Sequence, residues 1–202
     1  MAKPAGSACN LDCAYCFYLS KRVLPGGPGS GHMPDDVLER FVKDYIDSIT
    51  ADEVVFSWQG GEPTLLGLGF FEKVVALQKK HARAGQRIEN DLQTNGTLLD
   101  DDWARFLKQQ RFLVGLSIDG PREIHDHCRI TKHAEPTFDQ VFAAAKMLQK
   151  HGVRFNTLTC VHRYNASRPL DVYRFLRREI GSTYIQFIPI VEIKGFENMA
   201  PG

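Results

Sequence analysis

Apolar residues recur along this chain in two patterns that alternate with each other. Short apolar runs with the character of strands cover 52–58, 87–96, 111–120, 154–161 and 183–192. Apolar residues at helical spacing predict helices at 37–49, 67–83, 100–110, 137–153 and 168–181. Repeated β-α units favour a parallel sheet whose crossovers are right-handed. The pattern therefore predicts an α/β protein built on a parallel sheet.

The ends of several predicted elements carry signals of their own. Acidic residues open the helix at 100–110, where they suit a helix N-terminus. Gly152 is the expected C-cap of the helix at 137–153. The Gly- and Pro-rich run 24–32 predicts a flexible loop, and the "HDH" at 125–127 is interpreted as a solvated loop rather than a metal pair.

The carboxyl ends of the predicted strands indicate where the chemistry of this protein lies. Parallel α/β architectures place their functional groups at those ends, so the segments after the strands converge on one edge. Only "MAKP" precedes the first loop, so a strand there would be truncated. The segments that follow strands are "QGGEP" (59–63), "QTNG" (93–96), "SIDG" (117–120) and "IPIVE" (188–192).

Composition narrows the class of protein further. The 202 residues are 43% hydrophobic and 24% charged, as in ordinary globular proteins, and the net charge of +1 provides no drive toward nucleic acid. We find no apolar run that would span a membrane and no signal-peptide core. The expected location is the cytoplasm, where thiols stay reduced, so the five cysteines are interpreted as ligands or buried thiols.

Three of the five cysteines lie close together, Cys9, Cys13 and Cys16, with the spacing C-x3-C-x2-C. Three thiolates on a short loop can bind three irons of a 4Fe–4S cluster and leave the fourth iron open to a ligand. A structural zinc site with three cysteines and a remote histidine is the alternative. Cys160 lies in an apolar strand and is interpreted as a small buried hydrophobe, and Cys128 receives no role.

With Tyr15 before its last cysteine, this motif resembles the signature of the radical S-adenosylmethionine (SAM) enzymes. "GGEP" at 60–63 resembles the turn that receives the SAM amino group in that family. A wider set of segments resembles the anaerobic sulfatase-maturating enzymes, a SPASM-type branch. These segments are "KPAGSACNLDCAYCFY", "FSWQGGEPTL", "LQTNGTLLDDDWARFL", "FLVGLSIDGPREIHDHCR" and "IQFIPIVE".

The resemblance implies a fold and an activity. The fold is a partial (β/α)6 TIM-like barrel with a truncated first strand, formed by a radical SAM core domain over residues 1–202. The activity is reductive cleavage of SAM, which allows the oxidation of a cysteine or serine in a sulfatase to Cα-formylglycine. The implied partners are a sulfatase polypeptide and an electron donor such as flavodoxin or ferredoxin.

The resemblance also assigns residues to the cluster and to the methionine half of SAM. The three clustered cysteines match the cluster ligands, and Tyr15 matches a residue whose backbone lies against the adenine. Gly61 matches the methionine site, with Gly60 and Glu62 beside it. Glycines leave the backbone approachable, and Glu62 would add negative charge near the SAM ammonium group.

Further matches lie after the later strands. Ser117 matches a contact to the ribose or carboxylate region, and Asp119 lies beside it. Arg129 matches a residue that meets the SAM carboxylate, and Val191 matches an adenine contact. The alternatives are a strand-end cap for Ser117 and a surface arginine for Arg129. Two residues could face the substrate peptide, Tyr18 and Gln59, although Tyr18 could instead be a packed aromatic.

The chain also departs from the family pattern. No cysteine-rich extension follows Val191, and the aspartate proposed as the family's base would lie beyond Gly202. We therefore expect SAM cleavage with little formylglycine. Two other hypotheses stay open: a radical SAM enzyme acting on another ribosomal peptide, and an inactive fragment or binding module.

Overall fold

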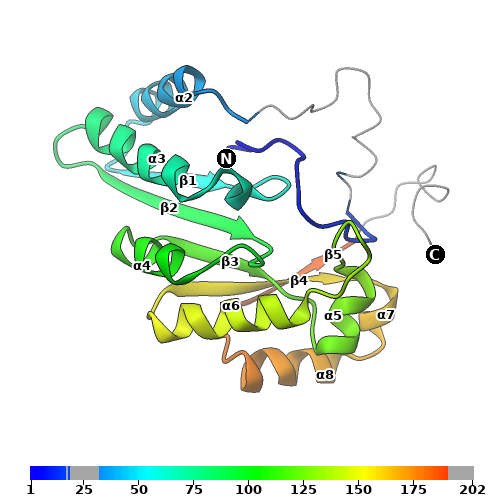
Figure 1. Cartoon of the computed structure of the whole chain (residues 1–202). Coiled ribbons are helices and arrows are strands. Elements are labelled where there is room, and N and C mark those ends of the chain that lie inside the picture. The colour runs from blue at the N-terminus through cyan, green and yellow to red at the C-terminus, as the bar shows by residue number, and fades with distance from the viewer. Residues whose placement is uncertain (17, 19–31, 191–202) are drawn as a thin grey trace.

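A curved parallel sheet of five strands organises the part of the chain that the structure describes, residues 1–16, 18 and 32–190 of a computed structural model (Figure 1). The strands lie side by side in chain order, and each neighbouring pair is parallel. Their bounds are β1 Glu53–Trp58, β2 Arg87–Thr94, β3 Leu113–Ser117, β4 Arg154–Val161 and β5 Ile185–Pro189. This arrangement confirms the predicted α/β class and the partial barrel.

Helices connect the strands and pack along the sheet (Figure 1). They are α2 Asp35–Ser48, α3 Leu68–His81, α4 Asp101–Gln109, α5 Arg122–Cys128, α6 Phe138–Lys150, α7 Arg163–Ala166 and α8 Pro169–Arg174, with a 3-10 turn η1 Pro63–Leu66 and a π-helical turn η2 Phe175–Glu179. Helix α4 begins as predicted, because the Asp100 carboxylate accepts a hydrogen bond from the Trp103 N–H at 2.9 Å. Within the described ranges, no helix has both the length and the apolar character that crossing a bilayer requires.

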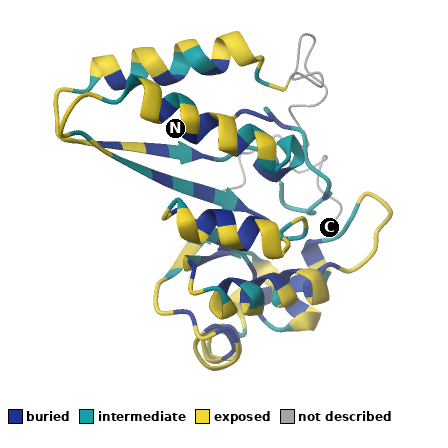
Figure 2. Ribbon diagram, turned by 60° about the vertical axis from the view of Figure 1, so that its left-hand side comes forward, coloured by how far each residue is buried: buried dark blue, intermediate teal, exposed yellow. Residues whose placement is uncertain are grey.

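Strand residues alternate between a face packed against the helices and an opposite face (Figure 2). In β1, Phe56 and Trp58 are buried among aromatic residues of α2 and α3, whereas Val55 on the other face is 41% exposed. Ser57 shares that second face and donates a hydrogen bond to Asp91 of β2 at 2.7 Å. The hydrophobic core therefore lies between the sheet and its helices, and polar groups occupy the other side.

The N-terminal segment pairs with the edge of β1. Ala2 forms an isolated parallel bridge with Trp58, and its N–H donates to the Ser57 carbonyl at 2.8 Å. The Gln59 N–H in turn donates to the Ala2 carbonyl at 3.0 Å. This isolated bridge lies where we expected a strand before the first loop, and it carries the following residues to the carboxyl end of the sheet.

Local structure differs from prediction at two places, and a third predicted segment lies almost entirely outside the described residues. The prediction of a solvated loop at 125–127 is wrong, because these residues belong to α5 and His125 is fully buried. The helix predicted at 168–181 is divided into α8 and the π-helical turn. The loop predicted at 24–32 lies outside the described residues except for its last position.

Candidate functional site

The segments that follow the strands meet at one edge of the sheet, as predicted. The GGEP turn, residues 60–63, follows β1, and Asn95 follows β2. Asp119 and His162 follow β3 and β4. The cysteine loop, residues 8–16, contacts all four of these positions through hydrogen bonds or ring stacking. The carboxyl edge therefore gathers the polar groups and the three cysteines in one place.

Backbone hydrogen bonds attach the cysteine loop to the segment at the end of α5. The Asp12 N–H donates to the Ile130 carbonyl at 2.9 Å, and the Ala14 N–H donates to the Cys128 carbonyl at 2.9 Å. Buried backbone groups need such partners because water cannot satisfy them. The loop thus keeps its shape through contacts with residues more than one hundred positions away in the chain.

The GGEP turn packs directly on the start of the cysteine loop. The Gly61 N–H donates to the Gly6 carbonyl at 2.9 Å, and the Glu62 N–H donates to the Ala8 carbonyl at 2.8 Å. A Cβ atom on Gly61 would lie 2.1 Å from the Ala8 carbonyl oxygen, which is too close for any side chain. Gly60 has φ +129°, a value that favours glycine. The glycines are therefore required for contact between the turn and the loop.

Glu62 holds the turn against the end of β2. Its side chain is fully buried, and Oε1 accepts hydrogen bonds from the Thr64 N–H at 3.0 Å and from the Thr64 and Thr94 hydroxyls at 2.6 and 2.8 Å. Oε2 accepts a hydrogen bond from the Asn95 N–H at 2.7 Å. Burial raises the pKa of this carboxyl, and the hydrogen bonds act in the opposite direction. Each oxygen thus has a protein partner.

Asp119 forms a second buried carboxylate centre, after β3. Its Oδ2 accepts hydrogen bonds from the Tyr15 hydroxyl and from Arg129 Nε, the latter at 2.9 Å. Its Oδ1 accepts from the Cys160 N–H at 3.0 Å. The guanidinium group of Arg129 also lies 5.5 Å from the centre of the Tyr15 ring. Burial opposes the charge of Arg129, but the Asp119 carboxylate raises its pKa well above the ordinary value.

His125 contacts the backbone of Asp119 and, through Thr137, the backbone of Arg129. Its Nδ1 accepts a hydrogen bond from the Asp119 N–H at 3.4 Å, and its Nε2 lies 3.1 Å from the Thr137 hydroxyl. That hydroxyl donates to the Arg129 carbonyl at 2.7 Å, so it accepts from Nε2–H. Burial lowers the pKa of His125 to about 3, with the Arg129 charge acting in the same direction. The ring is therefore neutral at physiological pH.

The three clustered cysteines are partly exposed and unbridged. Burial raises the pKa of Cys13 to about 12, so this thiol stays protonated at neutral pH unless a cation displaces its proton. Burial also raises the pKa of Cys9, and hydrogen bonds to its sulfur act against that effect. The Leu11 N–H and the Asn95 side-chain amide donate to Cys9 Sγ, with N···S distances of 3.4 and 3.8 Å. Such donors suit a thiolate bound to metal.

The arrangement of the thiols bears on the kind of metal centre. Across residues 1–16, 18 and 32–190, no group of three or more His, Cys, Asp or Glu side chains surrounds a single ion position. An iron–sulfur cluster binds each thiolate at a different iron, so its ligands need not converge on one point. Three thiols on one loop, with two N–H donors at Cys9, have the donor chemistry that an iron–sulfur cluster requires.

The other predicted site residues lie at or near the same edge. Ser117 ends β3 and is partly exposed. Gln59 lies between β1 and the GGEP turn, and the ring of Tyr18 has the Lys3 ammonium group 5.2 Å from its centre. The alternative of a surface arginine is wrong, because the side chain of Arg129 is only 8% exposed. One predicted contact, Val191, lies outside the described residues.

Sequence reasoning gave no role to two residues at this edge. Asn95 contacts both the cysteine loop and Glu62. His162 stacks on the Tyr15 ring with a centroid distance of 5.6 Å, and its Nδ1 lies 3.8 Å from the Cys128 sulfur. Its buried Nε2 has no hydrogen-bond partner among the described residues. Their positions directly after strands were the available signal, since that rule had already marked the "QTNG" segment.

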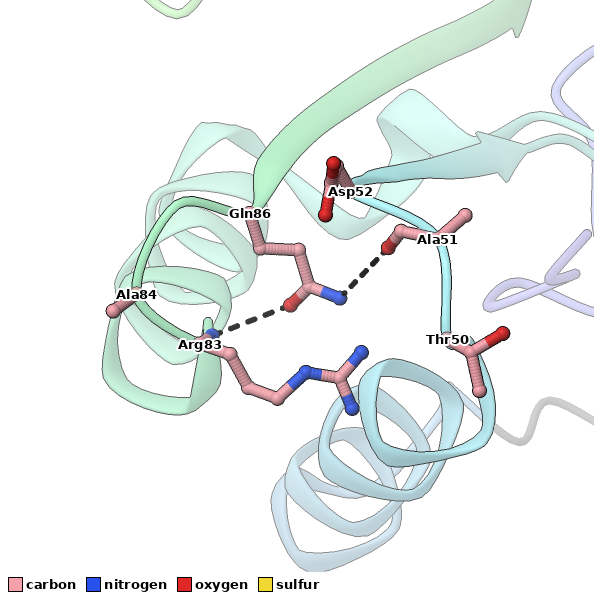
Figure 3. Close-up of a pocket in the computed structure, with 6 residues that line it drawn as sticks. All are labelled: Thr50, Ala51, Asp52, Arg83, Ala84 and Gln86. Carbon is pink, nitrogen blue, oxygen red and sulfur yellow. Dashed lines mark hydrogen bonds between the residues drawn. The ribbon is translucent and has the colours of Figure 1, made fainter.

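A cavity at the opposite end of the sheet is lined by none of the cysteines or other predicted site residues (Figure 3). It has a volume of about 240 Å³ and lies where the chain enters β1 and β2. Its lining residues are Thr50, Ala51, Asp52, Arg83, Ala84 and Gln86. Arg83 donates to the Ile49 carbonyl, and Gln86 bonds to the Arg83 N–H and the Ala51 carbonyl, so its polar groups serve the local turns. The carboxyl edge therefore remains the candidate site.

Comparison with known sequences identifies relatives of the chain. Residues 4–176 match the family model described as the radical SAM superfamily. The chain is 47% identical over 192 residues to a serine-type anaerobic sulfatase-maturating enzyme of Bacteroides thetaiotaomicron, covering 95% of this chain and 46% of that protein. It is 45% identical over 203 residues to a cysteine-type enzyme of Clostridium perfringens, covering 98% and 54%. The chain thus spans about half the length of the curated relatives it matches.

Solved structures give a consistent result. The chain superposes with a TM-score of 0.88 and 43% identity on native anSMEcpe with bound AdoMet and the Cp18Cys peptide, covering 98% of this chain and 54% of that one. It also superposes on Streptococcus suis SuiB bound to the precursor peptide SuiA, with a TM-score of 0.70. At 16% identity, this second likeness shows a shared fold alone.

Proposed function

The chain belongs to the radical SAM superfamily, and on that premise we propose that it forms the core of an enzyme that oxidises a cysteine or serine side chain in a sulfatase to formylglycine. Both serine-type and cysteine-type sulfatase-maturating enzymes are among its relatives at 45% identity or above. The proposed cofactors are SAM and a 4Fe–4S cluster bound by Cys9, Cys13 and Cys16.

One observation carries the proposal more than any other: the cysteine loop and the GGEP turn are in direct backbone contact. The two N–H bonds from Gly61 and Glu62 fix the turn beside the first cysteine. A cofactor bound through both segments needs them to keep a constant relative position, because small displacements weaken positioned chemistry strongly. Residues more than forty positions apart thus form one continuous surface at the carboxyl edge.

The SAM contacts proposed for this chain follow the same edge. Gly60, Gly61 and Glu62 would hold the methionine amino group through backbone carbonyls, because the Glu62 carboxylate is itself buried in protein contacts. Ser117 would contact the ribose or carboxylate region. Arg129 would meet the SAM carboxylate with the part of its guanidinium that Asp119 leaves unbonded, since Asp119 bonds to Nε.

The remaining assignments concern the adenine, the substrate and the electron donor. The Tyr15 backbone and Val191 would contact the adenine. Tyr18 and Gln59 would face the substrate peptide, and a peptide is bound in the anSMEcpe structure that the chain resembles. The electron donor would be a small reducing protein such as flavodoxin or ferredoxin.

In this proposal the protein residues bind and orient the cluster, SAM and the substrate, and they exclude water from the site. When bound, the reduced cluster and SAM supply the means of removing a hydrogen atom from the substrate methylene group. Asp119 and Arg129 fix the Tyr15 side chain and so hold the backbone between Cys13 and Cys16 in place. Glu62 fixes the GGEP turn, to which it belongs, against the end of β2.

Anaerobic reconstitution with iron and sulfide, followed by dithionite reduction, tests the proposal. The reduced protein receives SAM and synthetic sulfatase peptides that contain either the target cysteine or the target serine. Mass spectrometry then measures 5′-deoxyadenosine and the loss of mass at the target residue. We expect deoxyadenosine from the wild-type chain and none from a variant with Cys9, Cys13 and Cys16 replaced by alanine. A fully iron-loaded sample that forms no deoxyadenosine would overturn the proposed reaction. Because we expect little formylglycine from this chain, binding tests the substrate, and failure of the reconstituted chain to bind either peptide would overturn it.

A further inference from the structure

Asn95 joins the cysteine loop to the end of β2 through a closed ring of hydrogen bonds. Its Nδ2 donates to Asn10 Oδ1 at 2.9 Å, and Asn10 Nδ2 donates to the Thr97 hydroxyl at 2.8 Å. That hydroxyl donates back to Asn95 Oδ1 at 2.8 Å, and the Thr97 N–H donates to the same oxygen at 3.0 Å. Asn95 is 7% exposed, whereas Asn10 and Thr97 are partly exposed, so water is largely excluded from the Asn95 side of the ring.

The ring of bonds fixes which end of the Asn95 amide faces Cys9. If the amide were flipped, its oxygen would face Asn10 Oδ1 and its NH2 group would face the Thr97 N–H, so two good hydrogen bonds would become repulsive contacts. In the observed orientation, Nδ2 has a second hydrogen, and Cys9 Sγ lies 3.8 Å away. The Asn95 side chain therefore presents an N–H to this sulfur.

We propose that Asn95 is a positioning residue that raises the reduction potential of the cluster by donating a hydrogen bond to Cys9 Sγ. This rests on the proposed function, because it requires a cluster bound through Cys9. Reduction adds one negative charge to a cluster, and an N–H aimed at a ligand sulfur stabilises that charge. The donor makes the cluster easier to reduce, so it assists the electron transfer on which SAM cleavage depends.

Replacing the Asn95 side chain should change the reduction potential without changing SAM binding. Asn95 contacts Glu62 through its backbone N–H, at 2.7 Å from Oε2, and that bond survives replacement of the side chain. The GGEP turn should therefore keep its position in an Asn95 variant. A general loss of structure would weaken SAM binding and iron loading together, whereas loss of the sulfur hydrogen bond alone changes only the potential.

The test compares Asn95→Ala with Asn10→Ala, which is a matched control. Both substitutions remove one amide and open the same ring of bonds. Asn95→Ala removes an N–H donor to Cys9 Sγ, whereas Asn10→Ala removes an amide oxygen 3.9 Å from that sulfur, to which a metal-bound thiolate has no proton to donate. Each reconstituted chain is titrated anaerobically without SAM, and visible absorbance and electron paramagnetic resonance report the reduced cluster. At one fixed potential, we expect the ratio of reduced to oxidised cluster to fall about fivefold in Asn95→Ala, with an unchanged SAM dissociation constant. In Asn10→Ala the ratio should stay within about twofold of the wild-type value.

Equal shifts in the two variants, or an increase in Asn95→Ala, would overturn the inference. If Asn95→Ala fails to load iron, Asn95→Asp decides the question, because it keeps the acceptor for Thr97 and replaces the donor with a carboxylate oxygen. We expect a larger decrease in reduced cluster there, and an unchanged ratio would again overturn the inference. A wild-type chain that binds no iron would instead contradict the proposed cofactor, which is a different failure.

Discussion

Two buried carboxylates at the carboxyl edge are stabilised in different ways. Glu62 accepts hydrogen bonds only from neutral groups, namely the hydroxyls and N–H groups of Thr64, Thr94 and Asn95. Asp119 faces the guanidinium group of Arg129 as well as neutral donors. The first carboxylate joins neighbouring elements of the sheet, whereas the second joins the cysteine loop to β3 and to the end of α5.

The difference shows which half of the site depends on an ion pair for its stability: the half around the GGEP turn, or the half around the cysteine loop. Neutral donors compensate a buried carboxylate only in part, in agreement with the raised pKa of Glu62. A buried ion pair is compensated by its partner, so removal of one member leaves the other uncompensated. We therefore expect the loop half of the site, which contains Asp119 and Arg129, to be the more sensitive to loss of a carboxylate.

The largest expected effect comes from Asp119→Asn. Because Arg129 would stay buried without its counter-charge, the free energy of unfolding should decrease by about 3–5 kcal/mol. Glu62→Gln removes a carboxylate with neutral partners and should decrease it by about 1–3 kcal/mol. Urea denaturation measures both. Asp139→Asn, which breaks an exposed pair with Arg122, is the control and should have no measurable effect. Equal losses for Asp119→Asn and Glu62→Gln would contradict the comparison.

A methyl group on Gly61 tests the contact between the two halves. Its Cβ would lie 2.1 Å from the Ala8 carbonyl, so the turn and the cysteine loop must separate in Gly61→Ala. We expect a loss of stability of about 1–3 kcal/mol and reduced iron loading as well as weaker SAM binding. Gly69→Ala in α3 meets nothing within 4 Å and should leave all three unchanged or raise stability slightly. Normal iron loading with weakened SAM binding would contradict separation of the turn and the loop. It would show that the methyl group only occupies space that SAM needs.

Acid should weaken the loop half through His125. The folded protein holds this ring neutral with a pKa of about 3, below the ordinary value of 6.5, so the unfolded chain binds the proton more tightly. The contribution of His125 to the free energy of unfolding is therefore fully present above pH 6.5. It is lost as the pH falls from 6.5 toward 3, by about 1.4 kcal/mol per pH unit. Unfolding curves between pH 7 and 5 should have a steeper pH dependence for wild type than for His125→Gln. His133→Gln, at an exposed position, is the control, and identical slopes for wild type and His125→Gln would contradict the assignment.

The smallest expected effect is that of Tyr15→Phe. The variant loses the hydroxyl bond to Asp119 but keeps the ring stacked on His162, so stability should fall by about 1–2 kcal/mol. Iron loading should be retained, because the backbone bonds of the cysteine loop remain. Thermal unfolding and iron analysis measure the two outcomes. Tyr45→Phe, which loses a hydroxyl bond to the Val55 carbonyl near the surface, is the control. A complete loss of iron in Tyr15→Phe would show that the hydroxyl itself shapes the loop.

The strands and their parallel pairing were predictable, because apolar periodicity is local and alternating β-α units favour parallel sheets in general. Helix α4 also began where Asp100 predicted it, since a capping residue acts on the next turn alone. Helix α5 was missed because its seven residues include few apolar ones, so they show no helical periodicity. His125 is buried by residues that are distant in the sequence, such as Thr137. Nothing in the local pattern of charges reveals that a histidine is fully buried.

The site was predictable as a set of positions but not as a set of contacts. The strand-end rule located the GGEP turn and Asp119, and the motif located the cysteines. The sequence could not reveal that Gly61 is required by the Ala8 carbonyl, because that contact joins two loops whose approach depends on the whole sheet. The same limit hid the role of Asn95, whose partner Asn10 is 85 residues away in the chain.

Iron analysis of two sets of cysteine variants tests the central claim, that three cysteines of one loop hold the cluster at this edge. After anaerobic reconstitution, wild type should bind about four irons per chain, as one 4Fe–4S cluster requires. The same iron content and brown absorbance should persist in a variant with Cys128 and Cys160 replaced by alanine, and both should disappear when Cys9, Cys13 and Cys16 are replaced. Full iron content in the triple variant, or loss of iron in the double variant alone, would contradict the account.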